Sequence, residues 1–212
     1  MKNVRMVFSK AGNAKYISHL DLARTMARVL RRAALPVWYT EGFNRHPYIT
    51  FASPLSLGVE GMRETMDFRL EEDVSEGELL SRVNAVMPVG LQAVSVAEAV
   101  AKPGALSAAR YRMSFSCIAE PIHRLLSQPS ISVEKRTKQK TIRTLDIKPA
   151  FADAAVVEEG DRTVMTVTLP NSSNETVNPG LFVAALSRAV GEDVPCDIVR
   201  MELLLPDGSP FR

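Results

Sequence analysis

The order in which apolar periodicity changes along the first hundred residues limits what this chain can fold into. Residues 3–9 alternate apolar and polar side chains, as a half-buried strand does, and residues 18–34 repeat apolar side chains at helical spacing. Residues 49–58 indicate a strand that leads into a loop, and further strands are indicated at 64–72 and 90–100, with a helix at 75–87. This β-α-β-β-α-β order predicts a ferredoxin-like domain, an antiparallel sheet with its helices on one face.

The second half repeats the same pattern of elements without a repeat of individual residues. Residues 99–108, which include Lys102-Pro103-Gly104, are typical of a linker. Strands are indicated beyond it at 109–117, 131–137, 162–170 and 195–205, with helices at 120–128 and 178–190. We therefore expect an α+β protein of two tandem ferredoxin-like domains, at 1–100 and 106–212. A single larger α+β domain is the alternative.

The helix at 18–34 is expected to have one apolar face and one basic face. Ser18 and Asp21 have the spacing of a loose capping box, and Pro36 stops the helix. The apolar face on a helical wheel holds Leu22, Ala23, Met26, Val29, Leu30 and Ala33. The opposite face carries four guanidinium groups, those of Arg24, Arg28, Arg31 and Arg32. Such a face binds phosphates, docks an acidic protein, or is a solvated helix surface.

Charge is sorted by segment, although the net charge of the chain is only +2. Residues 1–47 hold nine basic side chains against two acidic ones, and residues 134–148 are basic again. Basic surfaces of this kind attract nucleic acids or acidic proteins. The second basic segment contains Lys135, Arg136, Lys138 and Lys140. We expect these four cations either to extend a track for nucleic acid or to lie on a solvated hairpin.

Two short segments, 15–24 and 41–61, contain the remaining candidate site residues. The first brings Lys15, Tyr16 and His19 to the start of the helix. The second contains a polar turn with Phe43, Asn44, Arg45 and His46, a mixture that suits an unpaired base and its phosphate. The alternatives are that His19 caps or packs, and that the turn is held by Asn44 with Phe43 as a hydrophobic plug.

Motifs for cofactors and metals are absent from the sequence. It has no phosphate-binding loop, dinucleotide fingerprint or serine-hydrolase elbow, and its two cysteines, Cys117 and Cys196, lack metal-ligand spacing. We therefore expect no cofactor and no metal. No apolar run reaches the ~18 residues of a membrane helix, and residues 1–12 do not resemble a signal peptide. We expect a cytoplasmic protein that does not bind membranes.

Residues 15–61 resemble the signature of the radical SAM-linked domain family, an uncharacterised bacterial family. The matching positions are Tyr16, Ser18, His19, Asp21, Arg24, Arg31, Arg32, Gly42, Phe43, Asn44, His46, Pro47, Leu57, Gly58 and Glu60. Residues 135–149 resemble a weaker, basic segment of the same family. The resemblance implies a radical SAM protein as partner and a function that involves RNA. Because this chain has no CxxxCxxC, radical chemistry would belong to the partner.

These observations favour an RNA-binding accessory protein without catalytic activity of its own, which works with a separately encoded radical SAM protein in tRNA or rRNA modification or processing. One alternative is a metal-independent endoribonuclease with His19 and His46 as acid and base, and with Tyr16 or an arginine stabilising the developing charge. This alternative has a loose, fold-level similarity to CRISPR repeat-processing endoribonucleases. Another alternative is a docking module for the radical SAM protein.

Overall fold

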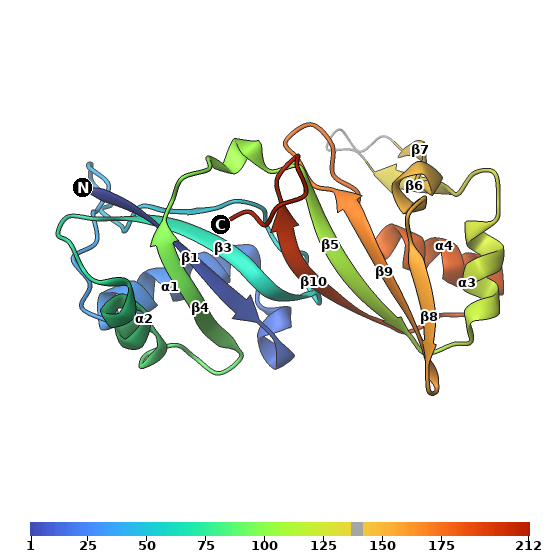
Figure 1. Cartoon of the computed structure of the whole chain (residues 1–212), viewed down its shortest axis with the longest axis horizontal. Helices are drawn as coiled ribbons and strands as arrows, with labels where there is room; N and C mark the ends of the chain where they lie inside the picture. Colours follow the sequence, from blue (N-terminus) through green and yellow to red (C-terminus); the bar gives the residue numbers. More distant parts are fainter. Residues whose placement is uncertain (137–141) are drawn as a thin grey trace. The chain divides into compact units, whose positions relative to one another are not determined.

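The computed structural model describes residues 1–136 and 142–212, which form two compact units (Figure 1). Unit 1 combines Met1–Leu106 with Arg200–Arg212, and unit 2 is Ser107–Val199. The fold is mixed α+β, with mostly antiparallel strands and, within the described residues, four α-helices. The domain limits expected from the sequence stay a prediction, and the compact units add that the C-terminal residues pack with unit 1.

The strands of unit 1 form an antiparallel sheet. They are β1 (Lys2–Lys10), β2 (Ile49–Phe51), β3 (Glu60–Leu70) and β4 (Leu91–Glu98), and β10 (Cys196–Leu204) ends in this unit. β1 lies between β4 and β3, and β2 also pairs with β3, all antiparallel. In this register Val4 lies opposite Phe68 and Met6 opposite Met66. The apolar residues of β1 and β3 therefore share one face of the sheet.

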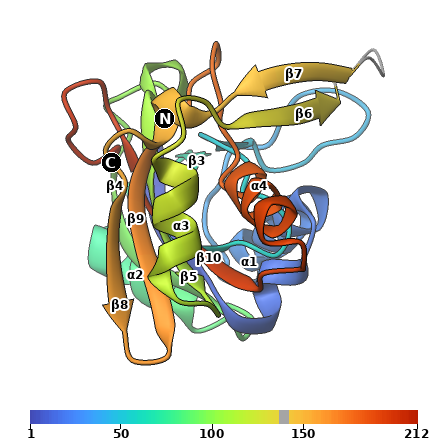
Figure 2. The ribbon, with the colours of Figure 1, turned by 90° about the vertical axis from the view of Figure 1, so that its right-hand side faces the viewer.

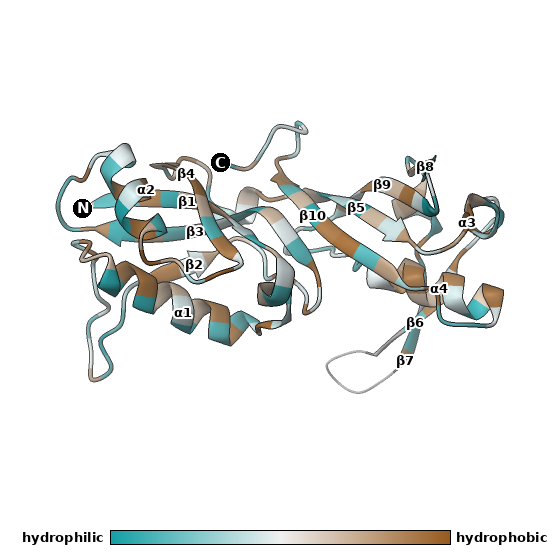
Figure 3. Cartoon of the chain, turned by 90° about the horizontal axis from the view of Figure 1, so that it is seen from below, coloured by the Kyte–Doolittle hydropathy of each residue, from teal (hydrophilic) through white to brown (hydrophobic). Residues whose placement is uncertain are grey.

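The helices of unit 1 begin where the sequence predicted. They are α1 (His19–Arg32) and α2 (Glu76–Asn84), and a short 3₁₀ helix, η1 (Gly12–Tyr16), precedes α1. Ser18 Oγ accepts a hydrogen bond from the backbone N–H of Asp21 at 3.1 Å, and Ser75 Oγ accepts one from Glu78 at 3.2 Å. Both serines thereby satisfy a backbone donor that the first helical turn leaves free. Figure 3 shows hydrophobic and hydrophilic residues alternating in bands along α1, as in an amphipathic helix.

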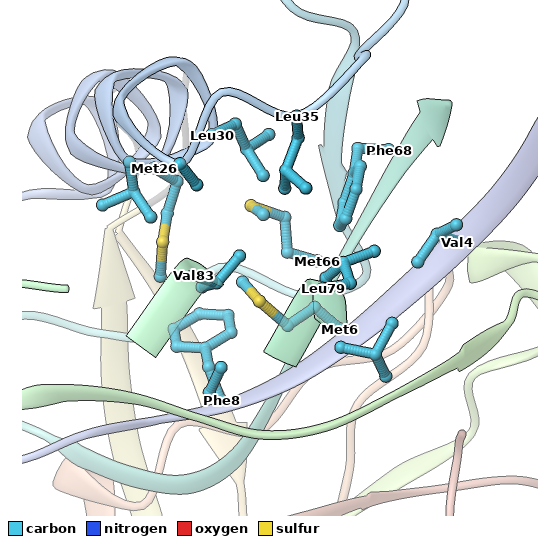
Figure 4. Packing of buried hydrophobic residues seen from close by; sticks show 14 of the residues in the cluster. Val4, Met6, Phe8, Met26, Leu30, Leu35, Met66, Phe68, Leu79 and Val83 are labelled. Atoms are coloured by element: carbon cyan, nitrogen blue, oxygen red, sulfur yellow. The ribbon is translucent and has the colours of Figure 1, made fainter. Parts of the chain in front are cut away.

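The core of unit 1 lies between the sheet and both helices (Figure 4). Strand residues 4, 6 and 8 of β1 and 66, 68 and 70 of β3 pack there. The helices contribute Leu22, Met26, Val29, Leu30 and Ala33 from α1 and Leu79 and Val83 from α2. Because side chains alternate along a strand, the residues between these positions, such as Arg5 and Asp67, face the other side of the sheet.

Unit 2 also combines α-helices with antiparallel strands (Figure 2). Its elements are β5 (Ala108–Phe115), α3 (Ala119–Leu126), β6 (Ser132–Arg136), β7 (Ile142–Asp146), β8 (Ala155–Glu159), β9 (Arg162–Pro170), α4 (Gly180–Val190) and the start of β10. β9 pairs antiparallel with β5 and with β8, and β10 lies next to β5. Short 3₁₀ helices, η2 (Pro103–Ala105) and η3 (Lys148–Phe151), lie in the connections.

Two features of unit 2 differ from the sequence-based expectation. The strand predicted at 131–137 corresponds to β6, but it pairs with β7 in a separate two-stranded sheet. The strand next to β9 is instead β8, which the sequence analysis missed. β8 is short, and nearly all of its residues are exposed, including Glu158 and Glu159. It therefore lacks the apolar alternation that reveals a half-buried strand.

In residues 1–136 and 142–212, no helix is both long enough and apolar enough to cross a bilayer.

Gly90 is a test of how tightly η1 packs against the start of β4. Its φ is +86°, and a Cβ there would lie 2.7 Å from Ala11 O and 2.8 Å from Ala14 Cβ. We expect Gly90→Ala to lower the free energy of unfolding by about 1–3 kcal/mol, because strain and overlap add. Gly77→Ala in α2, where a Cβ meets open space, is the matched control and should stay within about 1 kcal/mol of wild type. Urea unfolding measures both, and equal losses would contradict the expectation.

Candidate functional site

The basic face of α1 is exposed, as the helical wheel predicts. We define the arginine face as Arg24, Arg28, Arg31 and Arg32, all four of which are exposed. Arg24 pairs with Asp21 at 3.2 Å, and Arg28 Nη2 donates to Thr25 Oγ1 at 3.5 Å. Within the described residues, Arg28, Arg31 and Arg32 have no carboxylate partner. In the part of the chain that the structure describes, the arginine face therefore presents three guanidinium groups outside ion pairs, and of these the charge of Arg28 also acts on the nearby Asp21 carboxylate.

Asp21 is an acidic group beside the arginine face. A hydrogen bond from the Ser18 hydroxyl, then the hydrogen bond and charge of Arg24, and last the charge of Arg28 lower the pKa of the Asp21 carboxyl. Asp21 is therefore ionised at neutral pH, where it neutralises part of the charge of Arg24. Its negative charge also interacts favourably with the positive N-terminal end of the α1 dipole.

A cleft with a volume of about 540 Å³ borders the arginine face. Its lining residues are Thr25, Arg28, Val29, Arg32 and residues 85–89 of the loop between α2 and β4. In that loop Pro88 and Val89 are exposed, and Met87 is half-buried. Two guanidinium groups thus stand across from an apolar wall, an arrangement that accepts an anionic group carrying an apolar or aromatic part.

The residues just before α1 are held more tightly than the arginine face. The imidazole of His19 is half-buried and lies edge-to-face with the Phe51 ring, with ring centroids 5.1 Å apart. Lys15 Nζ lies 3.8 Å from Glu60 Oε1 and 5.5 Å from the centre of the Tyr16 ring, and the Tyr16 side chain is exposed. The structure thus supports a packing role for His19 and pairs the charge of Lys15 with a carboxylate.

The turn at 40–46 is closed by Thr40 and His46. The backbone N–H of Thr40 donates to His46 O at 2.9 Å, and the backbone N–H of His46 donates to Thr40 Oγ1 at 3.3 Å. His46 Nδ1 lies 2.9 Å from the backbone oxygen of Asn44. Phe43 is fully exposed at the tip, so the alternative in which it plugs the turn is wrong. Asn44 and Arg45 are exposed beside Phe43.

The two candidate acid–base histidines are on different elements. Within the described residues His19 contacts Phe51, whereas His46 contacts Thr40 and Asn44. The structure therefore does not bring the two imidazoles into contact with each other. The endoribonuclease alternative stays a prediction, and it would require a substrate that reaches both rings.

The second basic segment lies in unit 2. Lys135 and Arg136 belong to β6, where their backbones pair with those of Arg143 and Ile142. Lys138 and Lys140 lie outside the described residues. The β6–β7 pairing agrees with the hairpin alternative for the backbone of this segment, and a role in nucleic-acid binding stays a prediction.

A buried ion pair that the sequence analysis missed holds the segment 41–61 in place. Arg200 and Glu64 are 2% and 4% exposed, and the Arg200 guanidinium donates two hydrogen bonds to the Glu64 carboxylate, one of them at 2.8 Å. Arg200 also donates to Ser53 O at 2.9 Å, to Ser53 Oγ at 3.2 Å and to Pro54 O at 3.5 Å. The pair thereby anchors the loop that follows β2. No local motif reveals it, because 136 residues separate its partners.

Lys10 is a buried cation that holds the backbone of the segment 15–24. It is 1% exposed, and its Nζ donates to Ile17 O at 3.0 Å and to Lys15 O at 3.4 Å. Burial lowers the pKa of Lys10, the charge of Glu64 opposes that effect, and the charge of Arg200 adds to it. Strand alternation could have flagged Lys10, because it shares the core-facing side of β1 with Phe8.

The described part of the chain was expected to hold no metal site, and its two cysteines are Cys117 and Cys196. There, no group of three or more His, Cys, Asp or Glu side chains is placed to hold a metal ion. Cys117 and Cys196 are free thiols, and burial raises the pKa of Cys196 to about 12. A thiol with such a pKa is a poor nucleophile at neutral pH.

The fold and this surface define a mixed α+β protein that presents an exposed, largely unneutralised arginine face. More particularly, the chain belongs to the DUF2344 family, which is described as an uncharacterised protein conserved in bacteria and whose model matches residues 3–179. A comparison with curated proteins finds no match. The matched range covers the arginine face, the turn at 40–46 and most of unit 2.

We expect the Arg200–Glu64 pair to be among the most sensitive positions in unit 1. Glu64→Ala leaves a buried guanidinium without its partner, a change that costs about 3–5 kcal/mol of stability. The double variant Glu64→Leu/Arg200→Met removes both charges and should recover most of this loss. Arg124→Ala, which breaks the exposed Arg124–Glu120 pair, is the control and should change stability by less than about 1 kcal/mol. A Glu64→Ala loss no larger than the control, measured by urea unfolding, would contradict this expectation.

Lys10 should make stability depend on pH in the alkaline range. Its folded pKa is lowered, so between that pKa and the unfolded value of about 10.4 the unfolded chain binds more protons. The stability of wild type relative to Lys10→Met should therefore rise with pH through this window and level off below the folded pKa. Parallel urea titrations of both proteins from neutral pH to about pH 10 measure the difference, and a difference that falls with rising pH would refute the assignment.

Proposed function

We propose that this protein is an RNA-binding accessory protein of the cytoplasm that works with a separately encoded radical SAM protein. It presents tRNA or rRNA for modification or processing and needs no catalytic activity of its own. The observation that carries this proposal is the arginine face, in which Arg28, Arg31 and Arg32 are exposed and, within the described residues, unpaired with any acid.

The spacing of the arginine face suits a phosphate backbone. Residues four apart on a helix are separated by about 6 Å along its axis, so Arg24, Arg28 and Arg32 form a row. Guanidinium groups bind phosphate oxygens in a bidentate manner, and each neutralised phosphate releases counterions. The apolar wall of the neighbouring cleft gives a base or sugar a surface to pack on.

The turn at 40–46 supports the same function. An aromatic ring as exposed as that of Phe43 gains nothing from core packing, whereas it offers an unpaired base a surface for stacking. Arg45 and Asn44, exposed beside it, supply a cation and an amide for the phosphate and base edge. The hydrogen bonds of Thr40 and His46 close the base of the turn without a ligand.

We also propose that the two units are tandem ferredoxin-like domains, the second with the β6–β7 hairpin inserted. In unit 1 the pairs β1–β3, β1–β4 and β2–β3 are antiparallel, as the split βαβ pattern requires. In unit 2, β5, β8, β9 and β10 occupy the corresponding places in the order β10-β5-β9-β8. Sheets of this kind keep one face clear of helices, which leaves room for a ligand there.

The test is the salt dependence of tRNA binding. If six or more phosphates are contacted, affinity should fall at least ~10³-fold between ~50 and ~200 mM salt. The triple variant Arg28→Ala/Arg31→Ala/Arg32→Ala should bind more weakly at every salt concentration and reduce the slope of log K against log salt by about 2. Fluorescence anisotropy with labelled tRNA measures both quantities.

Arg188→Ala, an exposed arginine on α4 of unit 2, is the matched control and should bind as wild type does. No binding at ~50 mM salt would overturn the proposal, and so would a triple variant with unchanged affinity. If instead the triple variant loses a radical SAM protein whose co-purification resists nuclease, while tRNA affinity is unchanged, the arginine face is a protein-docking surface.

A further inference from the structure

A pocket lies on the side of the unit 1 sheet that faces away from α1 and α2. Asn3 of β1 and Asp67 and Arg69 of β3 reach it, because strand alternation points these residues away from the core. Tyr48, just before β2, and Thr50 of β2 form a further wall, and the linker contributes Ala99, Ala101, Lys102 and Pro103. Its volume of about 290 Å³ is at the small end for ligand pockets, which suits a single nucleotide rather than a larger cofactor.

Arg69 lines this pocket, and its side chain is held by neighbouring groups. Its guanidinium carbon lies 4.6 Å from the centre of the Tyr48 ring and 5.3 Å from that of Trp38. The Tyr48 and Trp38 rings lie edge-to-face with centroids 5.8 Å apart, and Arg69 Nε donates to Asn3 Oδ1 at 3.2 Å. A guanidinium held by two rings and an amide offers a planar cation that loses little entropy when another flat group stacks there.

The charge in the pocket favours an anionic ligand. Both carboxylate oxygens of Asp67 accept hydrogen bonds from Arg5 at 2.7 Å, so that acid is already neutralised. Arg5 also donates to Ala101 O at 2.7 Å, which fixes the linker over the sheet. Lys102 is exposed at the rim and, within the described residues, pairs with no carboxylate. Arg69 and Lys102 therefore leave the pocket with a positive excess.

Two neutral polar groups remain available to recognise a ligand. Asn3 uses only its Oδ1 for Arg69, so its Nδ2 donor has no partner in the described part of the chain. The Thr50 hydroxyl likewise has none there. A donor and a hydroxyl beside a stacked aromatic–guanidinium pair match the edge of a nucleobase, which carries both donors and acceptors.

We propose that this pocket binds one nucleotide. The base stacks on the Tyr48–Arg69 pair, Asn3 and Thr50 hydrogen-bond to its edge, and Lys102 contacts its phosphate. A free mononucleotide and an unpaired nucleotide of RNA share this chemistry. The inference deepens the RNA-binding proposal and rests on it for the second source only.

Trp38 makes the test direct, because it is the only tryptophan of the chain. We expect its fluorescence to change in a saturable manner on titration of the full chain with AMP or UMP. Ribose 5-phosphate, which has no base, should bind at least about 5-fold more weakly. Equal binding of AMP and ribose 5-phosphate would overturn the inference, and so would the absence of a saturable change with either nucleotide.

Variants separate the two halves of the ligand. Tyr48→Leu and Arg69→Ala should each weaken AMP at least about 5-fold. Lys102→Ala, at an exposed linker position that leaves the fold intact, should weaken AMP and flatten its salt dependence. Arg63→Ala is the matched control, because Arg63 is on the same strand but about 20 Å from Arg69, and it should bind as wild type does. If both single variants, Lys102→Ala and Tyr48→Leu, bind AMP with wild-type affinity, the assignment is overturned.

Short oligonucleotides distinguish the sources. An unpaired RNA hexamer that changes Trp38 fluorescence and competes with AMP identifies the site as part of the RNA surface, whereas AMP binding that the hexamer leaves unaffected identifies a free nucleotide. If neither AMP nor the hexamer changes Trp38 fluorescence while salt-dependent tRNA binding is retained, this inference alone is overturned. Retained AMP binding with no tRNA binding at ~50 mM salt overturns the proposed function alone.

Discussion

The buried ion pair between Arg200 and Glu64 joins β10 to β3 and to the loop after β2 inside unit 1. Two charges this deep are expensive to desolvate, and they are tolerated because the guanidinium and carboxylate face each other and the remaining donors reach the backbone of Ser53 and Pro54. Lys10 shares the site and holds the backbone of Lys15 and Ile17. The segment before α1 and the loop after β2 are thus both attached to one buried charge cluster.

The unit 1 sheet separates two kinds of chemistry. On its helix side apolar residues form a core, and the outer surface of α1 presents the arginine face. On its other side the sheet itself is the surface, and Arg69, Tyr48 and Asn3 form a small polar pocket. The first surface suits the repeated phosphates of the proposed RNA ligand, and the second suits a single flat group.

Local periodicity accounts for what was predictable. The strands at 3–9, 64–72 and 90–100, the helix caps at Ser18 and Ser75, and the exposed arginines of α1 all depend on residues within a few positions of each other. β8 was missed because an exposed edge strand carries no apolar alternation. The Phe43 interpretation failed because residue type says little about burial in a turn that backbone and Thr40 hydrogen bonds can close without it.

The sequence alone determined the element order, the amphipathic face of α1 and the absence of known cofactor motifs, because each is a property of neighbouring residues. Only the tertiary structure decided which distant residues meet. Arg200 reaches Glu64 across 136 positions, Arg5 reaches Asp67 across 62, and the pocket joins residues from β1, β2, β3 and the linker. Such contacts follow from strand pairing and packing, which no local pattern encodes.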